Sequence, residues 1–248
     1  MILPDTTLCA IVRDEAMNPA GGIIDFVDST VPFVEQAVIV DTGSVDGTRE
    51  MLEQLGSEYR NLTVVDATFT DYASARNISL KYAKTKRVLV LDADERLTRE
   101  DFKNLKKIMK EQPAIGYNFE IINIYGDEET ETGGIHNPRL FTRKPKGYLG
   151  KVYYENTDWR LGENFYVSCP YGRKSSQGKM DEEEGVTNIA ISIKHFHASV
   201  LGRDAKDKNW YTEVIWSIPE YGSEMPAPSR QPHFASWKQY NPRRELYR

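Results

Sequence analysis

This chain of 248 residues has few cysteines, no long apolar run and no large excess of positive or negative charge. Two cysteines, Cys9 and Cys169, are too few for a disulfide scaffold or for a zinc site built on four cysteines. No run approaches the roughly 18 apolar residues that a membrane-spanning helix needs. The 32 Lys and Arg against 37 Asp and Glu give a net charge of −5, which argues against a protein that coats DNA. We therefore expect a globular protein without an integral membrane segment, cytoplasmic or peripheral to a membrane.

Short apolar runs alternate with amphipathic segments over the first half of the chain. The runs are rich in Val and Ile, which is typical of strands buried on both faces, and the alternation predicts a mostly parallel sheet flanked by helices. The expected strands cover residues 7–12, 37–40, 62–65, 88–91 and 117–124, and the expected helices cover 48–55, 72–83 and 98–110. The fold class predicted is α/β, with a Rossmann-like nucleotide-binding half.

The pattern changes after residue 125. Residues 126–134 are acidic and contain glycine, which predicts a loop, and shorter strands are expected at 139–143, 147–154 and 188–196, with a late helix at 204–218. We therefore divide the chain into a nucleotide-binding half (1–125), a mixed acceptor-binding half of the same domain (126–218) and an extended C-terminal tail (219–248).

Polar residues follow several of the expected strands, and this edge is where ligands bind in open parallel sheets. Asp92 and Asp94 come directly after the apolar run 88–91, and residues i and i+2 of a strand point the same way. Two adjacent carboxylates suit a hard divalent cation that also binds substrate phosphates, and a solvated acidic turn is the alternative.

Two further segments suit a nucleotide. Asp41 ends the run 37–40, where its carboxylate could accept from a base N–H or a ribose hydroxyl, and Gly43 and Ser44 follow it in a turn before a helix. This segment lacks the Gly-Lys-Ser/Thr ending of a P-loop. Arg76 and Asn77 begin the helix that leads into the Asp92 strand, where an arginine could face a phosphate or orient a carboxylate.

Taken together, these segments resemble the family 2 glycosyltransferases of the GT-A fold, in a branch of small bacterial or phage members. The resemblance is carried by Val-Arg-Asp-Glu at 12–15, Val-Asp-Thr-Gly-Ser at 40–44, Ala-Arg-Asn at 75–77 and Leu-Asp-Ala-Asp-Glu at 91–95. It is strong over residues 6–110 and weaker over 137–155, which includes Pro-Arg-Leu-Phe at 138–141. Many members have a second Asp where this chain has Thr42, so the contact to the base can differ here.

The resemblance implies a nucleoside-diphosphate sugar donor, with a UDP-sugar expected, a divalent metal (Mn or Mg) and inversion at the anomeric carbon. By position, Glu15 and Asp41 would line the nucleoside pocket, and Arg76 and Asn77 would support it. Asp92 would approach the ribose or the metal, and Asp94 would ligate the metal. The Gln-x-x-Arg-Trp signature of processive synthases is absent from the sequence, which favours transfer of single sugars.

Two roles fall in the second half. His195 aligns with a late histidine of related members and is expected as a third metal ligand, ahead of His197. A catalytic base is expected among Glu155, Asp158 and Glu163. Glu155 is the first choice, because it follows a strand-like run and lies near the Val-His-Glu of related enzymes.

The acceptor is a hydroxyl that the sequence does not identify: a glycan, a lipid-linked glycan, a protein or a modified nucleic acid. Two other functions stay open. A sugar nucleotidyltransferase shares the architecture but usually has a Gly-rich basic loop where this chain has residues 13–16, and a non-catalytic nucleotide-sugar-binding protein would not need both Asp92 and Asp94.

Overall fold

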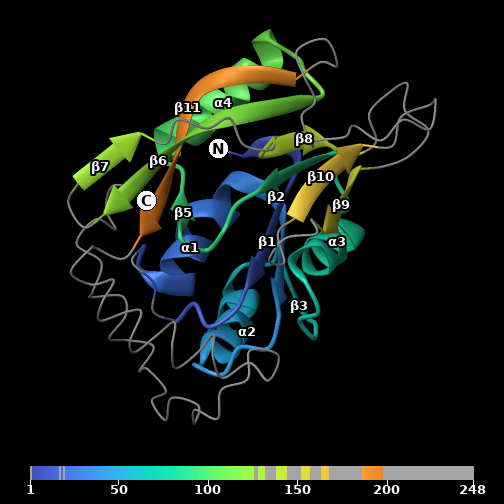
Figure 1. Ribbon diagram of the computed structural model, residues 1–248, viewed down its shortest axis with the longest axis vertical. Helices are drawn as coiled ribbons and strands as arrows, with labels where there is room; N and C mark the ends of the chain where they lie inside the picture. The colour runs from blue at the N-terminus through green and yellow to red at the C-terminus, as the bar shows by residue number, and fades with distance from the viewer. Residues whose placement is uncertain are drawn as a thin grey trace.

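A computed structural model describes residues 2–16, 18, 20–125, 128–131, 138–143, 152–156, 163–167 and 186–197 of the chain. Figure 1 shows a central twisted sheet with helices on both of its faces. The predicted helix at 204–218, the tail at 219–248 and Asp158 lie outside the described residues. No helix in the described ranges is long and apolar enough to cross a membrane.

The first half forms the parallel sheet that the sequence predicts. Strands β1 (Leu3–Val12), β2 (Val34–Asp41), β3 (Leu62–Asp66) and β4 (Arg87–Val90) lie in the order β3-β2-β1-β4, and each neighbouring pair is parallel. Their side chains alternate between two buried clusters: Ala37 and Ile39 of β2 face one, and Val38 and Val40 face the other. Burial on both faces explains the apolar runs in β1, β2 and β4, whereas β3 lies at the edge of the sheet and is only partly buried.

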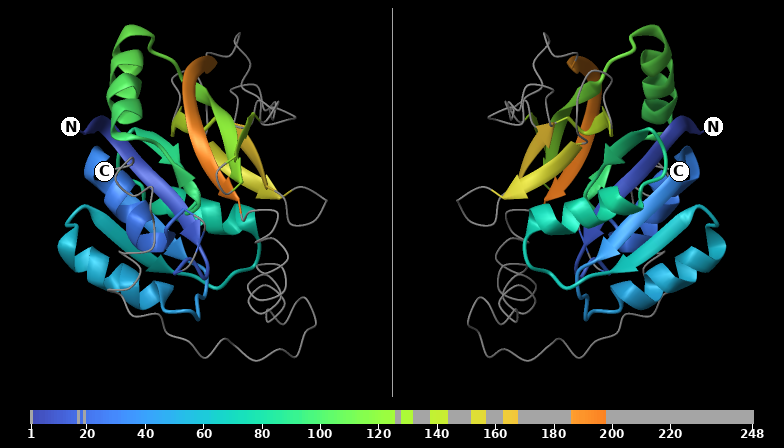
Figure 2. Two further views of the ribbon diagram at one scale, coloured as in Figure 1. Left: turned by 90° about the vertical axis from the view of Figure 1, so that its left-hand side faces the viewer. Right: turned by 90° about the vertical axis from the view of Figure 1, so that its right-hand side faces the viewer.

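Helices cover the two faces of this sheet (Figure 2). Helices α1 (Gly22–Thr30), α2 (Thr48–Glu58) and α4 (Arg99–Glu111) contribute to one cluster, and α3 (Tyr72–Tyr82) contributes to the other. Helix α4 is preceded by a capping box at Thr98, whose hydroxyl accepts from Asp101 N–H. Helix α1, which continues into a 3-10 turn (Val31–Phe33), was not predicted; eight of its nine residues are buried, polar ones such as Asp25 included.

The second half extends the same sheet with strands of both directions. Strand β8 (Leu140–Thr142) pairs antiparallel with β4 and β6 (Gly116–Tyr125), and β11 (Val186–His197) pairs parallel with β6 and antiparallel with β5 (Glu95–Arg96). The expectation of a loop over 126–134 was wrong where β7 (Glu128–Glu131) pairs with β6. Cross-strand hydrogen bonds hold this acidic segment in a strand that its composition does not favour.

A separate two-stranded sheet lies against α3. It consists of β9 (Val152–Asn156) and β10 (Glu163–Val167), which are antiparallel. The strand expected at 147–154 overlaps β9, whereas no strand was expected at β10, which begins at Glu163.

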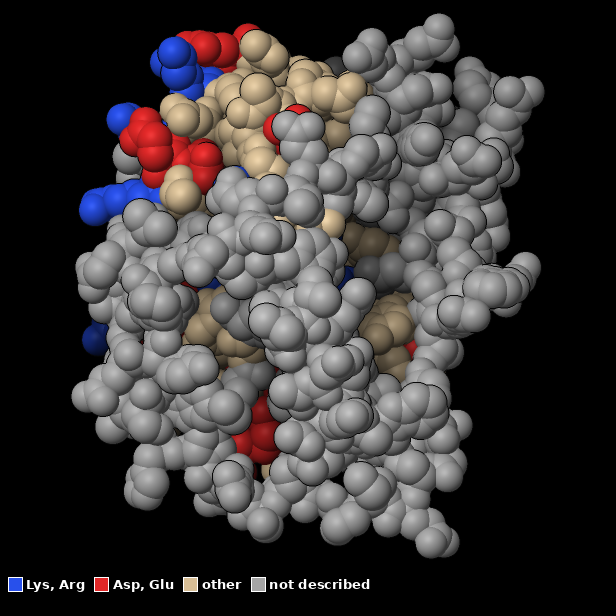
Figure 3. All heavy atoms as spheres, turned by 60° about the vertical axis from the view of Figure 1, so that its left-hand side comes forward, with Lys and Arg blue, Asp and Glu red and all other residues tan. Residues whose placement is uncertain are grey.

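The described surface carries charge of both signs. On the face drawn in Figure 3, Lys and Arg atoms lie beside Asp and Glu atoms at the upper left. On the exposed side of α4, for example, the Lys103 ammonium lies 3.0 Å from the Glu100 carboxylate. Mixed charge agrees with the small net charge of the chain.

Candidate active site

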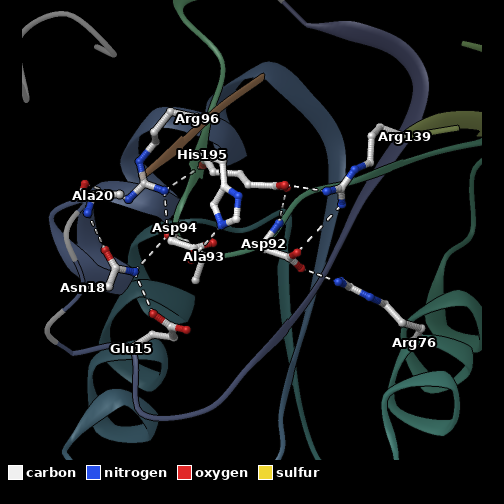
Figure 4. Close-up of polar contacts among 11 residues, drawn as sticks. Glu15, Asn18, Ala20, Arg76, Asp92, Ala93, Asp94, Arg96, Arg139 and His195 are labelled. Atoms are coloured by element: carbon white, nitrogen blue, oxygen red, sulfur yellow. Dashed lines mark hydrogen bonds and ion pairs between the residues drawn. The ribbon is translucent and has the colours of Figure 1, made fainter. Parts of the chain in front are cut away.

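The site lies where the parallel strands β1, β2 and β4 end, and polar side chains from several elements converge there (Figure 4). The turn that follows β4 supplies Asp92 and Asp94, α3 supplies Arg76, and β11 supplies His195. This is the edge at which open α/β sheets bind ligands.

Asp92 lies between two arginines. The Arg76 guanidinium donates a hydrogen bond to Asp92 Oδ1, and Arg139 Nη1 lies 3.9 Å from Asp92 Oδ2. Burial alone would raise the pKa of Asp92, but the two guanidinium groups outweigh burial and lower it to about 2. The sequence suggested that Arg76 could face a phosphate or orient a carboxylate. In the structure it contacts the carboxylate of Asp92.

Glu95 completes this charged group. Its side chain is buried, Oε1 accepts from Arg139 Nη2 at 2.5 Å, and Oε2 accepts from the backbone N–H of Asp92 at 2.9 Å. Burial raises the pKa of Glu95 to about 7, even though Arg139 favours the charged form. Glu95 thereby fixes both the backbone of Asp92 and the guanidinium that faces it.

Asp94 meets His195 rather than Asp92. Its Oδ2 lies 3.3 Å from His195 Nε2, and each side chain is about one-third exposed. Burial lowers the pKa of His195, but the hydrogen bond and charge of Asp94 outweigh it, so the net shift is upward. The strand geometry expected for the two aspartates was wrong, because β4 ends at Val90 and Glu95 N–H donates to Asp92 C=O in a turn. The turn sends the two carboxylates to different partners.

The donor set at Asp94 fits a divalent cation. A carboxylate suits Mg²⁺ or Mn²⁺ and an imidazole suits transition-metal cations, so this partly exposed pair fits a divalent transition-metal ion. Within the described ranges, no three His, Cys, Asp or Glu side chains form a group that could hold a metal ion alone. Further ligands for an ion here can come from oxygen atoms of a bound substrate or water, which is the usual arrangement for a cation that accompanies phosphates.

The loops after β1 and β2 are held together by carboxylates. Asp14 Oδ1 accepts from Val45 N–H at 2.7 Å, and Asp46 Oδ2 accepts from Ala16 N–H at 2.9 Å. Ser44 Oγ accepts from Asp14 N–H at 2.9 Å, so the serine expected to contact a nucleotide also links the two loops. Burial raises the pKa of Asp14 to about 6.

Asp41 is buried at the end of β2 with one oxygen unengaged. Its Oδ1 accepts from the N–H groups of Gly43 and Ser44, each at 2.9 Å, and Gly43 adopts a φ of 105° that favours glycine. Oδ2 is buried and has no hydrogen-bond partner in the described structure. A buried carboxylate oxygen normally has a donor, so this atom suits an N–H or O–H group of a ligand.

Asn18 and Arg96 join the β1 loop to the turn that carries Asp94 (Figure 4). Asn18 Nδ2 donates to Glu15 Oε2 at 2.7 Å and to Ala93 C=O at 3.0 Å. The buried Arg96 donates to Ala93 C=O at 2.7 Å and to Ala20 C=O at 3.0 Å. Glu15, expected in the nucleoside pocket, is thus positioned beside this turn.

Asn77 contacts the acceptor half. Its amide group makes two hydrogen bonds with the backbone of Tyr154 in β9. Glu155 follows Tyr154 in β9 and Glu163 begins β10, and the structure describes their backbones and not their side chains.

Sequence reasoning assigned no role to Glu95 or Arg139, although both lie in the motifs that carry the resemblance. They are 44 residues apart and meet through the pairing of β4 with β8, which local patterns do not predict. The signal available in the sequence was that each of these two motifs contains a charged residue to which no role had been given.

Comparison with known proteins agrees with this fold. The sequence profile of glycosyl transferase family 2 matches residues 32–205, which is more than half of the chain. A TPR repeat-containing protein of Synechococcus elongatus is 29% identical over 159 residues, a match that covers 63% of this chain and 36% of that protein. The chain thus spans about a third of the length of that curated relative.

Solved structures give weaker likenesses. S. aureus TarS 1–349 in complex with UDP-GlcNAc has a TM-score of 0.48 and 12% identity, covering 77% of this chain and 58% of that one. The mannosyltransferase PcManGT from Pyrobaculum calidifontis, in complex with GDP-Man and Mn²⁺, has a TM-score of 0.38 and 22% identity, covering 49% of this chain and 36% of that one.

The chain belongs to glycosyl transferase family 2. Its GT-A-like α/β fold, with a parallel half and a mixed half, confirms the fold class predicted from the sequence.

Proposed function

We propose that this chain is a metal-dependent inverting glycosyltransferase that moves a sugar from a nucleoside-diphosphate donor to a hydroxyl acceptor. A UDP-sugar is the proposed donor. One observation carries the proposal: the partly exposed Asp94–His195 pair lies beside the Arg76–Asp92–Arg139 group at the ligand-binding edge of a family 2 chain.

The donor's nucleoside would occupy the end of β2. Asp41 Oδ2, which is buried and unengaged, would accept from the base N–H, and Glu15 would line the same pocket. Gly43 and Ser44 would shape the turn that borders it. Asp92 would accept from the ribose hydroxyls, because two guanidinium groups keep its carboxylate ionised.

A divalent cation would be held by Asp94 and His195, with donor oxygens completing its coordination. It would neutralise the charge of the leaving diphosphate. We place Asp92 outside this ligand set, because Arg76 and Arg139 compete with a cation for the same carboxylate.

The acceptor hydroxyl needs a base on the side opposite the leaving group in an inverting transfer. Glu155 is the proposed base, since β9 brings its backbone next to α3. Asp158 is the reserve candidate from the sequence alone, and the acceptor can be a glycan, a lipid-linked glycan, a protein or a modified nucleic acid.

Product analysis tests the function. The chain is incubated with Mn²⁺ and UDP-, GDP-, CMP- or dTDP-sugars, with water as the acceptor, and the released nucleotide and the anomeric configuration of the released sugar are measured. We expect a free nucleoside diphosphate from one donor class, with inversion of the sugar. Formation of inorganic diphosphate from a sugar 1-phosphate and a nucleoside triphosphate would instead establish a nucleotidyltransferase, and binding without turnover would contradict the enzymatic role.

A further inference from the structure

Where helix α3 packs against strand β9, the Asn77 side chain of α3 hydrogen-bonds to both the N–H and the C=O of one β9 residue, Tyr154. Asn77 Nδ2 donates to the carbonyl of Tyr154 at 2.8 Å, and Tyr154 N–H donates to Asn77 Oδ1, also at 2.8 Å. The amide nitrogen and the amide oxygen of Asn77 each make one of these bonds. The contact therefore fixes both the position of Tyr154 along α3 and its distance from α3.

This contact matters because β9 is not hydrogen-bonded to any described strand of the main sheet. Among the described strands, β9 pairs with β10 alone, and the two form a sheet separate from the nine-stranded one. A two-stranded sheet is marginally stable by itself, so its placement depends on packing against the rest of the protein. Tyr154 is buried against α3 and β4 in the cluster that contains Ala73, Leu80 and Val88.

The same helix orients the donor side of the site. Arg76, the residue before Asn77, is buried and bonds to Asp92. Burial lowers the pKa of Arg139, but Glu95 and Asp92 outweigh burial and raise the pKa of this guanidinium, which faces Asp92. Two consecutive residues of α3 thus hold Asp92 and Tyr154.

We propose that Asn77 is a positioning residue that holds β9 through Tyr154, and with it the backbone of the next residue, Glu155, which is the proposed base. This inference rests on the proposed function and goes beyond it, because it moves Asn77 from the donor pocket to the acceptor side. Helix α3 then fixes the geometry between donor and base with adjacent side chains.

The variants are chosen to remove this contact with little change in volume. Asn77→Asp retains an acceptor for Tyr154 N–H but sets a carboxylate oxygen against the Tyr154 carbonyl, and Asn77→Ala removes both bonds. Asn61 is the matched control, because its Nδ2 also donates to two backbone carbonyls, those of Val31 and Val34, each at 3.0 Å. Asn61→Asp and Asn61→Ala report the cost of losing such bonds away from the site.

Kinetics use UDP-GlcNAc with Mn²⁺ as the probe, water as the acceptor, and UDP release as the signal. We expect Glu155→Gln to lower kcat by ~10²-fold or more, as for loss of a base. Asn77→Ala should lower kcat by ~10–10²-fold through misplacement of that base, with KM for UDP-GlcNAc unchanged. In the Asn77→Ala/Glu155→Gln double variant, the Asn77 change should add no further loss, because both act on one step.

Hydrogen exchange gives a readout that does not depend on activity. Asn77→Ala should speed exchange of the Tyr154 amide, and the Asn61 variants should not. Unchanged exchange at Tyr154, a raised KM with unchanged kcat, or equal losses from Asn77→Ala in the wild-type and Glu155→Gln backgrounds would each overturn the inference. Wild-type protein that releases no nucleoside diphosphate from any donor in the panel would instead overturn the proposed function itself.

Discussion

Asp14 should make the protein less stable as the pH rises from 4 to 6. The residue is 1% exposed, and burial raises its pKa from 3.8 to about 6. Because the folded pKa exceeds the unfolded one, the folded state binds the proton more tightly, and the resulting stability is present below about pH 4 and is lost by about pH 6. A shift of about 2 units corresponds to about 3 kcal/mol of unfolding free energy, as an order of magnitude.

The Asp14→Asn variant isolates this effect, because its amide cannot ionise and its oxygen can still accept from Val45 N–H. Asparagine also tolerates the φ of 55° at this position. We expect urea unfolding to show similar stability for the two proteins at pH 4 and a variant more stable by about 3 kcal/mol at pH 7.5.

Asp5→Asn is the control for the backbone effect, since Asp5 has a φ of 53° and accepts a backbone N–H from Lys86. Its change in stability is subtracted from that of Asp14→Asn. The corrected difference in unfolding free energy between Asp14→Asn and the wild type should grow from pH 4 to pH 7.5. If it does not grow, burial does not disfavour the ionised form of Asp14, and the reasoning is refuted.

Two further predictions concern other buried groups. Arg139→Met should destabilise the protein by about 3–5 kcal/mol at pH 9, where the buried Glu95 loses its ion-pair partner, and by less at pH 6, where Glu95, whose pKa is about 7, is protonated; thermal unfolding at both pH values would show this, and an unchanged Tm at pH 9 would contradict the pairing. In a Cys169→Ser background, the fully buried Cys9, whose pKa burial raises to about 12, should react with an aromatic disulfide reagent only on unfolding, and rapid reaction of the folded protein would contradict its burial.

The parallel half of the fold was predictable, because its strands are buried on both faces and therefore stand out as apolar runs. Strand β4 illustrates the limit: the apolar run predicts the strand, but not that it stops at Val90 and that Asp92 and Asp94 then lie in a turn. Helix α1 was missed because its polar positions do not mark a solvent-facing side: eight of its nine residues are buried, Asp25, Ser29 and Thr30 included.

Within the site, sequence reasoning found residues that follow strands but not the partners that they meet. Asp94 and His195 were expected together, and they lie in contact, 101 residues apart. The buried Glu95–Arg139 pair and the Asn77–Tyr154 contact depend on how β8 and β9 lie against β4 and α3, and no local spacing encodes that arrangement.

The central claim is that nucleotide binding depends on a divalent cation held by Asp94. Calorimetric titration of UDP into wild-type and Asp94→Asn protein, each with Mn²⁺ and with EDTA, tests it most directly. We predict that Mn²⁺ tightens UDP binding to the wild type and that Asp94→Asn binds UDP with the same weak affinity in both conditions. An Asp94→Asn protein that keeps the full Mn²⁺-dependent gain in UDP affinity would contradict the account.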